Sequence, residues 1–214
     1  MLSNHERGVT HMRHRIISIS RQFGSGGHEI SEALSKALGI PLYDRELITI
    51  AAKESGLATE SLEHADESTG SREGQPASYF GLTTSDTLFL AQTKVIRSLA
   101  QKEDCIIVGR CSDVVLLGEP NVDLLRVFIH APVEYRLQRS KRVEKLSTQQ
   151  ATLLLRRKDK ERRTYFTYYT DKEWGAQSNY DLSLNSAYWS VAQCVEMLKA
   201  AYDHMPRGEE EETS

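Results

Sequence analysis

The sequence has no apolar run that approaches the roughly 20 residues of a membrane span, and charged residues interrupt residues 1–13, where a secretory signal would be apolar. Cysteine is scarce. Cys105, Cys111 and Cys194 cannot all pair with one another, and no Cys/His spacing typical of a metal site occurs. Cys105 and Cys194 lie in apolar runs, so we expect buried thiols there. These absences exclude a disulfide scaffold and favour a cytoplasmic protein with no membrane partner.

The composition is that of a globular protein. Apolar residues make up 39% of the 214 residues, enough for a sizeable core, and the formal net charge is -3. A chain of this length forms one domain, with or without an inserted lid. We expect a disordered leader over residues 1–13, a folded domain over 14–204 and a disordered acidic tail over 205–214.

Short apolar runs alternate with helical patterns along the folded part. Strands are expected over 15–20, 42–43, 105–109, 124–132 and 180–186, and helices over about 46–55, 85–102, 133–163 and 191–202. A further helix follows the first strand and ends at Gly39, and the 133–163 pattern is interrupted near Ser147. Strands separated by helices predict an α/β fold with a parallel, five-stranded sheet. Ligands of such sheets bind beyond the carboxyl ends of the strands.

Gly24, Ser25, Gly26 and Gly27 join the first strand to the helix that follows it. Glycines permit positive φ and the close approach of a ligand, and the exposed amides of a helix N-terminus favour a phosphate. A glycine-rich turn is also compatible with simple packing of a strand against a helix. The motif by itself does not decide between these interpretations.

The loop departs from the Walker A pattern G-x-x-x-x-G-K-[ST], in which the Lys binds phosphates and the hydroxyl binds Mg²⁺. If Gly27 is the last loop glycine, His28 and Glu29 stand at the Lys and Ser/Thr places. If Gly26 is the last, Gly27 and His28 stand there. The Lys is missing in both registers.

The first Gly of the pattern is missing too, and its place falls to Gln22 or Arg21. Arg21, at the end of the strand, is the nearest side chain that can supply a fixed positive charge. Its alternative role is a surface salt bridge. Glu29 is a candidate Mg²⁺ ligand in place of the hydroxyl.

Several segments resemble the cytidylate-kinase-like family of P-loop kinases: ISRQFGSGGHEISEALSKALGIPLYDRELI, IIVGRCSDVVL, LRVFIHAPVEYRLQR, and DKERRTYFTYYTDKEWG to NYDLSLNS. They occur in the family's order from residue 15 to about 200. The resemblance implies a three-layer P-loop kinase fold with a helical acceptor-binding insertion over 45–104 and an arginine-bearing lid over about 140–178. It also implies transfer of the ATP γ-phosphate, with Mg²⁺, to a pyrimidine nucleoside monophosphate such as CMP or dCMP. True cytidylate kinases keep the Walker Lys and carry Asp directly after the Gly-Arg pair, where this chain has Cys111.

Positive charge is concentrated between Glu134 and Arg163, where eleven Lys and Arg stand against four Asp and Glu. In a chain of net charge -3, this segment predicts a polyanionic partner. Arg156, Asp159 and Arg162 recur every three residues on one helix face, with Arg163 beside the last. The resemblance places them in the lid, where arginines fold over the phosphates. The alternative is a solvated face of Arg–Asp pairs.

Arg110 follows a strand and Gly109, so it emerges at the ligand edge, and the resemblance makes it a monophosphate contact. Asp113 either contacts the base or caps the next helix. Asp44 and Arg45 follow the short second strand, where the acceptor site begins in monophosphate kinases. Asp44 is alternatively a helix N-cap. An aromatic cluster either packs the lid against the core or stacks on a base: Tyr165, Phe166, Tyr168, Tyr169 and Trp174.

These observations favour a nucleoside monophosphate kinase with nucleotide substrates, ATP and Mg²⁺. The missing Lys favours a second interpretation, a nucleotide-binding regulatory protein that kept the fold and lost catalysis. A third is a kinase of another small molecule on the same scaffold. A nucleic-acid partner is not expected, because the chain outside the basic segment is acidic.

Overall fold

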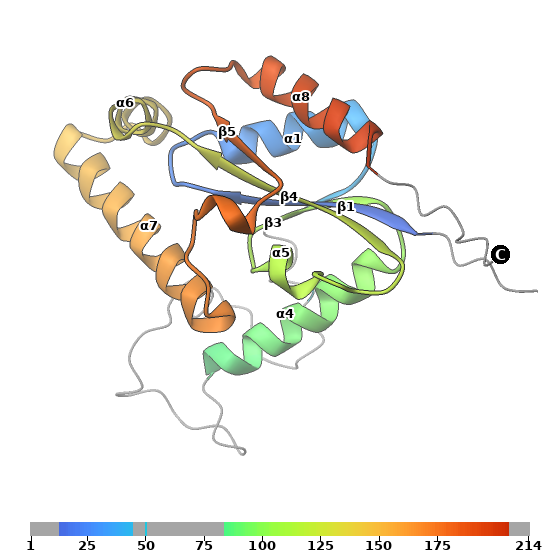
Figure 1. The fold of residues 1–214 in the computed structure, drawn as a ribbon. Helices are drawn as coiled ribbons and strands as arrows, with labels where there is room; N and C mark the ends of the chain where they lie inside the picture. Colours follow the sequence, from blue (N-terminus) through green and yellow to red (C-terminus); the bar gives the residue numbers. More distant parts are fainter. Residues whose placement is uncertain (1–12, 45–49, 51–83, 206–214) are drawn as a thin grey trace, which may run out of the picture.

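The computed structural model describes residues 13–44, 50 and 84–205, which contain five strands (Figure 1). These are β1 (His14–Arg21), β2 (Leu42–Tyr43), β3 (Cys105–Val108), β4 (Val122–His130) and β5 (Leu182–Asn185). They form one sheet in the order β2-β3-β1-β4-β5, and every neighbouring pair is parallel. Ile16, Ile17 and Ile19 of β1 are fully buried, as expected for a parallel sheet covered on both faces. The predicted five-stranded parallel sheet is confirmed.

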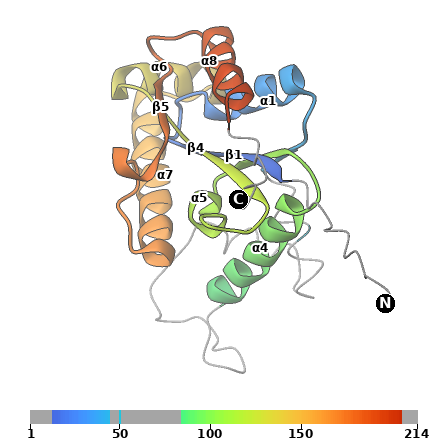
Figure 2. The same cartoon turned by 45° about the vertical axis from the view of Figure 1, so that its right-hand side comes forward.

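Helices cover both faces of the sheet and give three layers (Figures 1 and 2). One face carries α1 (Gly27–Leu38) and α8 (Val191–Asp203), and the other carries α4 (Thr84–Ala100) and α5 (Ser112–Val115). Successive side chains of a strand point to opposite faces. Ile17 therefore shares an apolar cluster with Ile30 of α1 and Leu198 of α8. Its neighbour Ile16 shares a cluster with Ile96 of α4.

Two helices follow β4 at the carboxyl edge of the sheet, α6 (Val133–Glu144) and α7 (Thr148–Thr170). Ser147 caps α7: its Oγ accepts a hydrogen bond from Gln150 N, and the Gln150 side chain accepts one from Ser147 N. The predicted interruption near Ser147 is therefore confirmed. Helix α7 continues past its expected end at Arg163 because aromatic side chains of its last turns pack against the core.

The aromatic side chains that follow Arg163 belong to a buried cluster between α7, α4 and the sheet. It contains Cys111, Phe128, Tyr165, Phe166, Trp174 and Tyr180, with Phe89 and Tyr169 packed against it. The rings of Phe89 and Tyr169 stack at a centroid distance of 3.9 Å, and Tyr165 Oη donates to Gln92 Oε1 at 3.1 Å. Packing of the lid against the core is thus the arrangement observed, and only Tyr168 among the five predicted aromatics is mainly exposed.

The ends of the folded part differ from the expected boundaries. Arg13, assigned to the leader, pairs with Asp123 at 2.7 Å, and Met205, assigned to the tail, is buried in the core. The helix expected over 46–55 lies outside the described residues, apart from position 50. All three cysteines are buried and free, as expected for two of them. None of the described helices is both long and apolar enough to cross a membrane.

Candidate functional site

The ends of β1, β3 and β4 meet at one edge of the sheet, where α1, α5 and α6 begin. Backbone hydrogen bonds hold the connecting loops to this edge: Gln22 N donates to Ile129 O and Gly109 N to Ile19 O, each at 3.0 Å. Gln22 Oε1 accepts a further bond from Ala131 N at 3.1 Å. The carboxyl edge of a parallel sheet is where α/β proteins bind ligands. Three loops that carry predicted site residues therefore converge where a ligand is expected.

The glycine loop adopts a conformation that requires glycine at two positions. Gly24 and Gly26 have φ of 75° and 80°. A Cβ on Gly24 would lie 2.7 Å from Ser140 Oγ and 2.9 Å from Arg136 O, so the loop packs on α6 too closely for a side chain. Ser140 is 2% exposed, and its Oγ has no hydrogen-bond partner among the described residues. A buried, unpartnered hydroxyl thus lies beside the loop.

The start of α1 decides which residues occupy the Walker places. Gly26 is the N-cap, and α1 begins at Gly27. In the strand–loop–helix order of a Walker A motif, the Lys and Ser/Thr open the helix, so Gly26 is the last loop glycine. Gly27 and His28 then stand at the Lys and Ser/Thr places, and Arg21 stands at the place of the first Gly. A glycine N-cap supplies no side chain to the first amides of α1, which leaves them to a bound anion.

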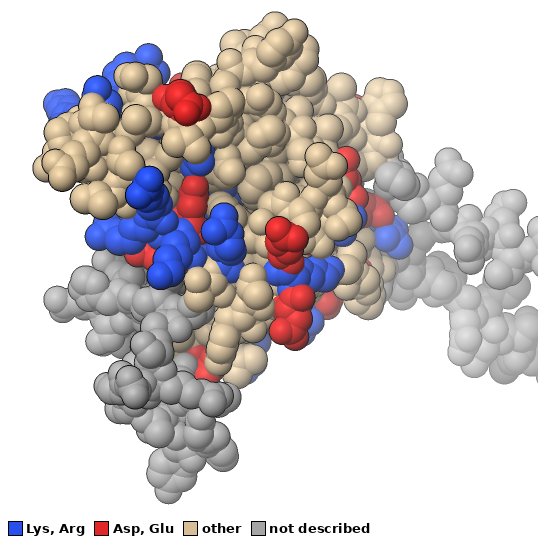
Figure 3. All heavy atoms as spheres, turned by 60° about the vertical axis from the view of Figure 1, so that its left-hand side comes forward, with Lys and Arg blue, Asp and Glu red and all other residues tan. Residues whose placement is uncertain are grey.

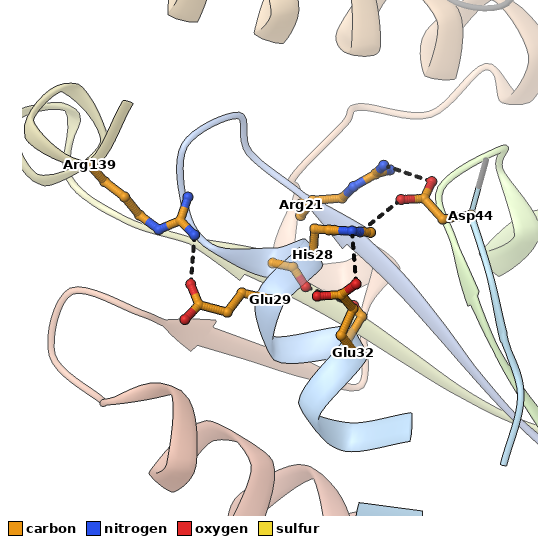
Figure 4. Close-up of polar contacts among 8 residues, drawn as sticks. Arg21, His28, Glu29, Glu32, Asp44 and Arg139 are labelled. Atoms are coloured by element: carbon orange, nitrogen blue, oxygen red, sulfur yellow. Dashed lines mark hydrogen bonds and ion pairs between the residues drawn. The ribbon is translucent and has the colours of Figure 1, made fainter. Parts of the chain in front are cut away.

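Arg21 extends from the end of β1 toward Asp44, which follows β2 (Figure 4). Arg21 Nη2 lies 3.4 Å from Asp44 Oδ1, and Asp44 Oδ2 lies 3.1 Å from His28 Nδ1. One half-buried carboxylate therefore joins the two basic groups on this side of the loop. The N-cap alternative for Asp44 involves the residues that follow it, and these, with Arg45, lie outside the described part of the chain.

Glu29 points in another direction, toward α6 (Figure 4). Its Oε2 lies 2.7 Å from Arg139 Nη2. The Arg139 guanidinium lies close over the loop, because a Cβ on Gly26 would be 3.3 Å from Arg139 Nε. Arg21 and Arg139 therefore flank the first turn of α1 from different sides. The Mg²⁺ role of Glu29 stays a prediction.

Two residues of α7 bind the backbone of the glycine loop. Asp159 Oδ1 accepts a hydrogen bond from Phe23 N at 2.8 Å, and Asp159 Oδ2 accepts one from Arg136 Nη1. Arg162 Nη1 donates to Arg21 O at 3.0 Å. The spacing of three along the helix, which singled out these residues in the sequence, brings both onto the loop. Asp159 acts here as a positioning group for the loop.

The other two arginines of the predicted lid have different surroundings. Arg156 is exposed, and Arg163 lies with its guanidinium 6.0 Å from the centre of the Trp174 ring. Figure 3 shows Lys and Arg side chains gathered on the face that α6 and α7 form, with Asp and Glu among them. Charge therefore surrounds the site, but only part of it reaches the loop.

Two cavities open at this edge and share a wall. The loop cavity, about 380 Å³, is lined by the glycine loop and by His28, Glu29, Asp44, Arg139, Ser140 and Arg162. The smaller Arg110 cavity, about 40 Å³, is lined by Gly109, Arg110, Cys111, Tyr165, Phe166 and Trp174. Arg21 and Arg162 line both. These two arginines therefore stand between the predicted donor site and the predicted acceptor site.

Arg110 is held in an unfavourable backbone conformation. Gly109, Arg110 and Cys111 are consecutive residues with positive φ, at 80°, 62° and 56°. A non-glycine residue in the left-handed region costs roughly 1–2 kcal/mol, and such strain concentrates at functional sites. Arg110 is 9% exposed and lines the Arg110 cavity. The structure therefore has Arg110 at the edge of the sheet where the sequence predicts it.

Asp113 is buried behind this turn and lines neither cavity. Its carboxylate has no side-chain hydrogen-bond partner among the described residues. Burial raises its pKa to about 6, and the nearby backbone amides of Asp113 and Val114, together with Lys172 and Arg126, offset only part of that effect. Cys111 is the N-cap of α5, so Asp113 lies within the first turn and not at the cap. Its contact with a base stays a prediction.

Several further groups shape the loop. Arg136 and Arg139, which belong to the basic segment predicted to face a polyanion, project toward it from α6. Ser186, beyond β5, donates from Oγ to Ser25 O at 2.5 Å. No local signal marks Ser186 or Ser140, because the glycine loop beside which they lie is distant from both in sequence.

The chain is similar to one known protein family over most of its length. Residues 16–188 match the cytidylate kinase-like family. A cytidylate kinase of Methanopyrus kandleri is 27% identical over 113 residues, which cover 50% of this chain and 58% of that protein. A cytidylate kinase of Thermococcus kodakarensis is 24% identical over 196 residues, 91% of each chain. The chain thus spans little more than half of the first relative and nearly all of the second.

Solved structures agree on the fold. The crystal structure of a protein from Eubacterium ventriosum, described as uncharacterized, has a TM-score of 0.68 at 26% identity and covers 89% of this chain and 99% of that one. Shikimate kinase of Bacteroides thetaiotaomicron has a TM-score of 0.52 at 12% identity, covering 89% and 98%. At that identity the likeness shows the fold alone, and the predicted P-loop kinase fold is confirmed.

Proposed function

Because this chain belongs to the cytidylate kinase-like family, we propose that it transfers the γ-phosphate of ATP to a pyrimidine nucleoside monophosphate such as CMP or dCMP. One observation carries the proposal: Arg21 and Arg162 line both the loop cavity and the Arg110 cavity. A donor phosphate on the loop and an acceptor phosphate at Arg110 would meet between these two arginines.

The donor side fits the phosphates of ATP. Phosphoryl transfer asks little covalent chemistry of a protein and depends on positioning and on charge near the transferring group. The glycine loop supplies a tight backbone turn at a helix N-terminus, and Arg21, Arg139 and Arg162 line the cavity in front of it. Arginine suits phosphate because its planar fork binds two oxygens at once.

Oxygen ligands for Mg²⁺ are present in the loop cavity. Asp44 and Glu29 line it, and either carboxylate would hold the ion together with phosphate oxygens. A Mg²⁺ site in a kinase usually consists of one or two carboxylates plus oxygens of the substrate. When bound, the ion neutralises charge on the transferring phosphates.

The acceptor side rests on Arg110. Its charge, at the end of β3 and in a turn of three left-handed residues, would hold the monophosphate. Arg162 would stabilise the transferred group, since its guanidinium is already anchored on the loop at Arg21 O. Asp113 would act from beneath the acceptor site, on the base or on the turn that carries Arg110.

A regulatory, catalytically impaired nucleotide-binding protein is the second candidate. It is favoured by the carboxylates that already pair with three arginines of the site: Asp44 with Arg21, Glu29 with Arg139, and Asp159 with Arg136. A ligand has to compete with the first two of these pairs. Such a protein would bind ATP without transferring its phosphate.

Steady-state ADP formation separates the two candidates. The protein is assayed with ATP and Mg²⁺ against CMP, dCMP, UMP, AMP and no acceptor, beside Arg110→Ala and the exposed control Arg157→Ala. Turnover that requires a pyrimidine monophosphate and falls in Arg110→Ala alone supports the kinase. ATP binding without acceptor-dependent turnover supports the regulatory protein.

A further inference from the structure

We propose that the positive charge and the first glycine of the motif have exchanged places in this loop. Arg21 performs the role of the Walker lysine, and Gly27, which stands at the place of that lysine, leaves the space that the Arg21 side chain requires. This inference rests on the nucleotide site proposed above. It explains why the Lys and the first Gly of the motif are missing together.

The two places lie against one another. An ideal Cβ on Gly27 would fall 2.7 Å from Arg21 Cβ and 3.0 Å from Arg21 Cγ. These are atoms at the root of the Arg21 side chain, which cannot swing away as the end of a flexible chain can. A lysine at position 27 and any side chain at position 21 therefore exclude one another. The Walker pattern places a glycine at position 21 and a lysine at position 27. This chain has a cationic residue, Arg21, at the first position and Gly27 at the second.

A second glycine makes room for the other end of Arg21. An ideal Cβ on Gly109 would lie 2.3 Å from Arg21 Nη1. Arg21 thus passes between two glycines, Gly27 at its root and Gly109 at its tip. The side chain is only 13% exposed, and Arg21 lines both cavities. Its charge is therefore fixed beside the loop, where the motif needs it.

The contacts of Arg21 suit a group that binds phosphate. Its backbone oxygen is held by Arg162, and its Nη2 approaches Asp44 at 3.4 Å, long for a charge-assisted hydrogen bond. A triphosphate would offer shorter bonds to the same guanidinium. The unpartnered Ser140 Oγ beside Gly24 is an independent sign that this cavity takes a polar ligand.

A swap of the two residues tests the proposal. Arg21→Ala, Arg21→Gly and Gly27→Lys are compared with the double variant Arg21→Gly/Gly27→Lys, which restores the first Gly and the Lys of the Walker pattern, and with the control Arg157→Ala. Calorimetry in the presence of Mg²⁺ gives the Kd for a non-hydrolysable ATP analogue and the Kd for adenosine. Thermal melting checks that each variant folds.

We expect each Arg21 single variant to lose roughly tenfold to hundredfold in analogue affinity, the range for charge-assisted hydrogen bonds, with adenosine binding unchanged. Gly27→Lys alone should melt earlier because of the clash with Arg21. The double variant should regain most of the affinity that Arg21→Gly loses, and Arg157→Ala should bind as the wild type does.

Three results would overturn the proposal: Arg21→Ala within twofold of the wild type, a folded double variant that binds no better than Arg21→Gly, or a wild type that binds no analogue. Phosphate transfer is measured separately. A wild type that binds the analogue but phosphorylates no acceptor refutes the kinase proposal, while the affinities still decide the role of Arg21.

Discussion

Asp159 and Phe23, 136 positions apart in the sequence, are joined by a hydrogen bond of 2.8 Å from the loop amide to the carboxylate. The same carboxylate binds Arg136, whose Nη1 also donates to Phe23 O at 3.2 Å. Helices α6 and α7 therefore fix the backbone of the glycine loop from outside the sheet. The predicted lid segment and the glycine loop are thus joined by direct hydrogen bonds.

Removal of Asp159 should loosen this connection. Asp159→Ala leaves the buried Arg136 without its carboxylate and frees the Phe23 amide, so the free energy of unfolding should fall by about 3 kcal/mol. Urea unfolding measures this, with Lys160→Ala on the exposed side of α7 as the control. In Asp159→Asn, a positioning role predicts a raised KM for ATP with much of kcat kept. Equal stability of Asp159→Ala and Lys160→Ala would contradict the account.

Gly24 should tolerate no side chain, whereas Gly39 should tolerate one. Both have positive φ, at 75° and 67°, so alanine costs each about 1 kcal/mol of backbone strain. A Cβ on Gly24 also meets Ser140 and the Arg136 backbone, while one on Gly39 meets nothing within 4 Å. We expect Gly24→Ala to lower the free energy of unfolding by roughly a further 1–3 kcal/mol and to lose ATP affinity. Calorimetry measures the ATP affinity of Gly24→Ala and Gly39→Ala. Equal affinities would contradict the claim that the loop packs too closely on α6 to accept a side chain.

Two substitutions of Arg110 should have the same effect on acceptor binding but different effects on the free energy of unfolding. Arg110→Gly and Arg110→Ala both remove the guanidinium, so each should raise the KM for the acceptor roughly tenfold to hundredfold and leave ATP affinity unchanged. Glycine relieves the φ of 62°, so Arg110→Gly should unfold with about 1 kcal/mol more free energy than Arg110→Ala. Acceptor kinetics that match the wild type would remove Arg110 from the acceptor site.

The burial of Asp113 should make stability depend on pH. Its pKa is raised from 3.8 to about 6 in the folded protein, so the unfolded chain releases this proton at a lower pH than the folded one. The wild type therefore loses stability from this group as pH rises from about 4 to 6. Asp113→Asn should be more stable by about 3 kcal/mol near pH 8, and the gain should vanish near pH 4. Urea unfolding of both proteins at the two pH values measures this, and a gain independent of pH would contradict it.

The fold was largely predictable because its signals are local. Isoleucine-rich runs mark buried strands, and the Ser147 to Gln150 spacing of a capping box marks the start of α7. Contacts near the ends of the folded part were not predictable, because they depend on tertiary structure. Arg13 pairs with Asp123, and Met205 packs in a core that no local pattern reveals.

Several residues that line the candidate site were singled out from the sequence, but their contacts were not predictable. Arg21, Arg110 and Arg162 follow from strand ends and helical spacing, and all three line the cavities. Their partners depend on loops that meet only in the folded chain. The packing of Arg21 on Gly27 depends on how tightly the glycine loop turns, which the five intervening positions do not reveal.

The most direct test of the central claim is to follow the γ-phosphate itself. The wild-type protein is incubated with γ-labelled ATP, Mg²⁺ and CMP or dCMP, and the products are separated. With the acceptor held below its KM, the account predicts label in CDP or dCDP, and a roughly tenfold to hundredfold slower appearance of that label with Arg110→Ala. Label that stays in ATP, or appears only as free phosphate, would contradict the claim that this chain is a phosphotransferase acting on pyrimidine nucleoside monophosphates.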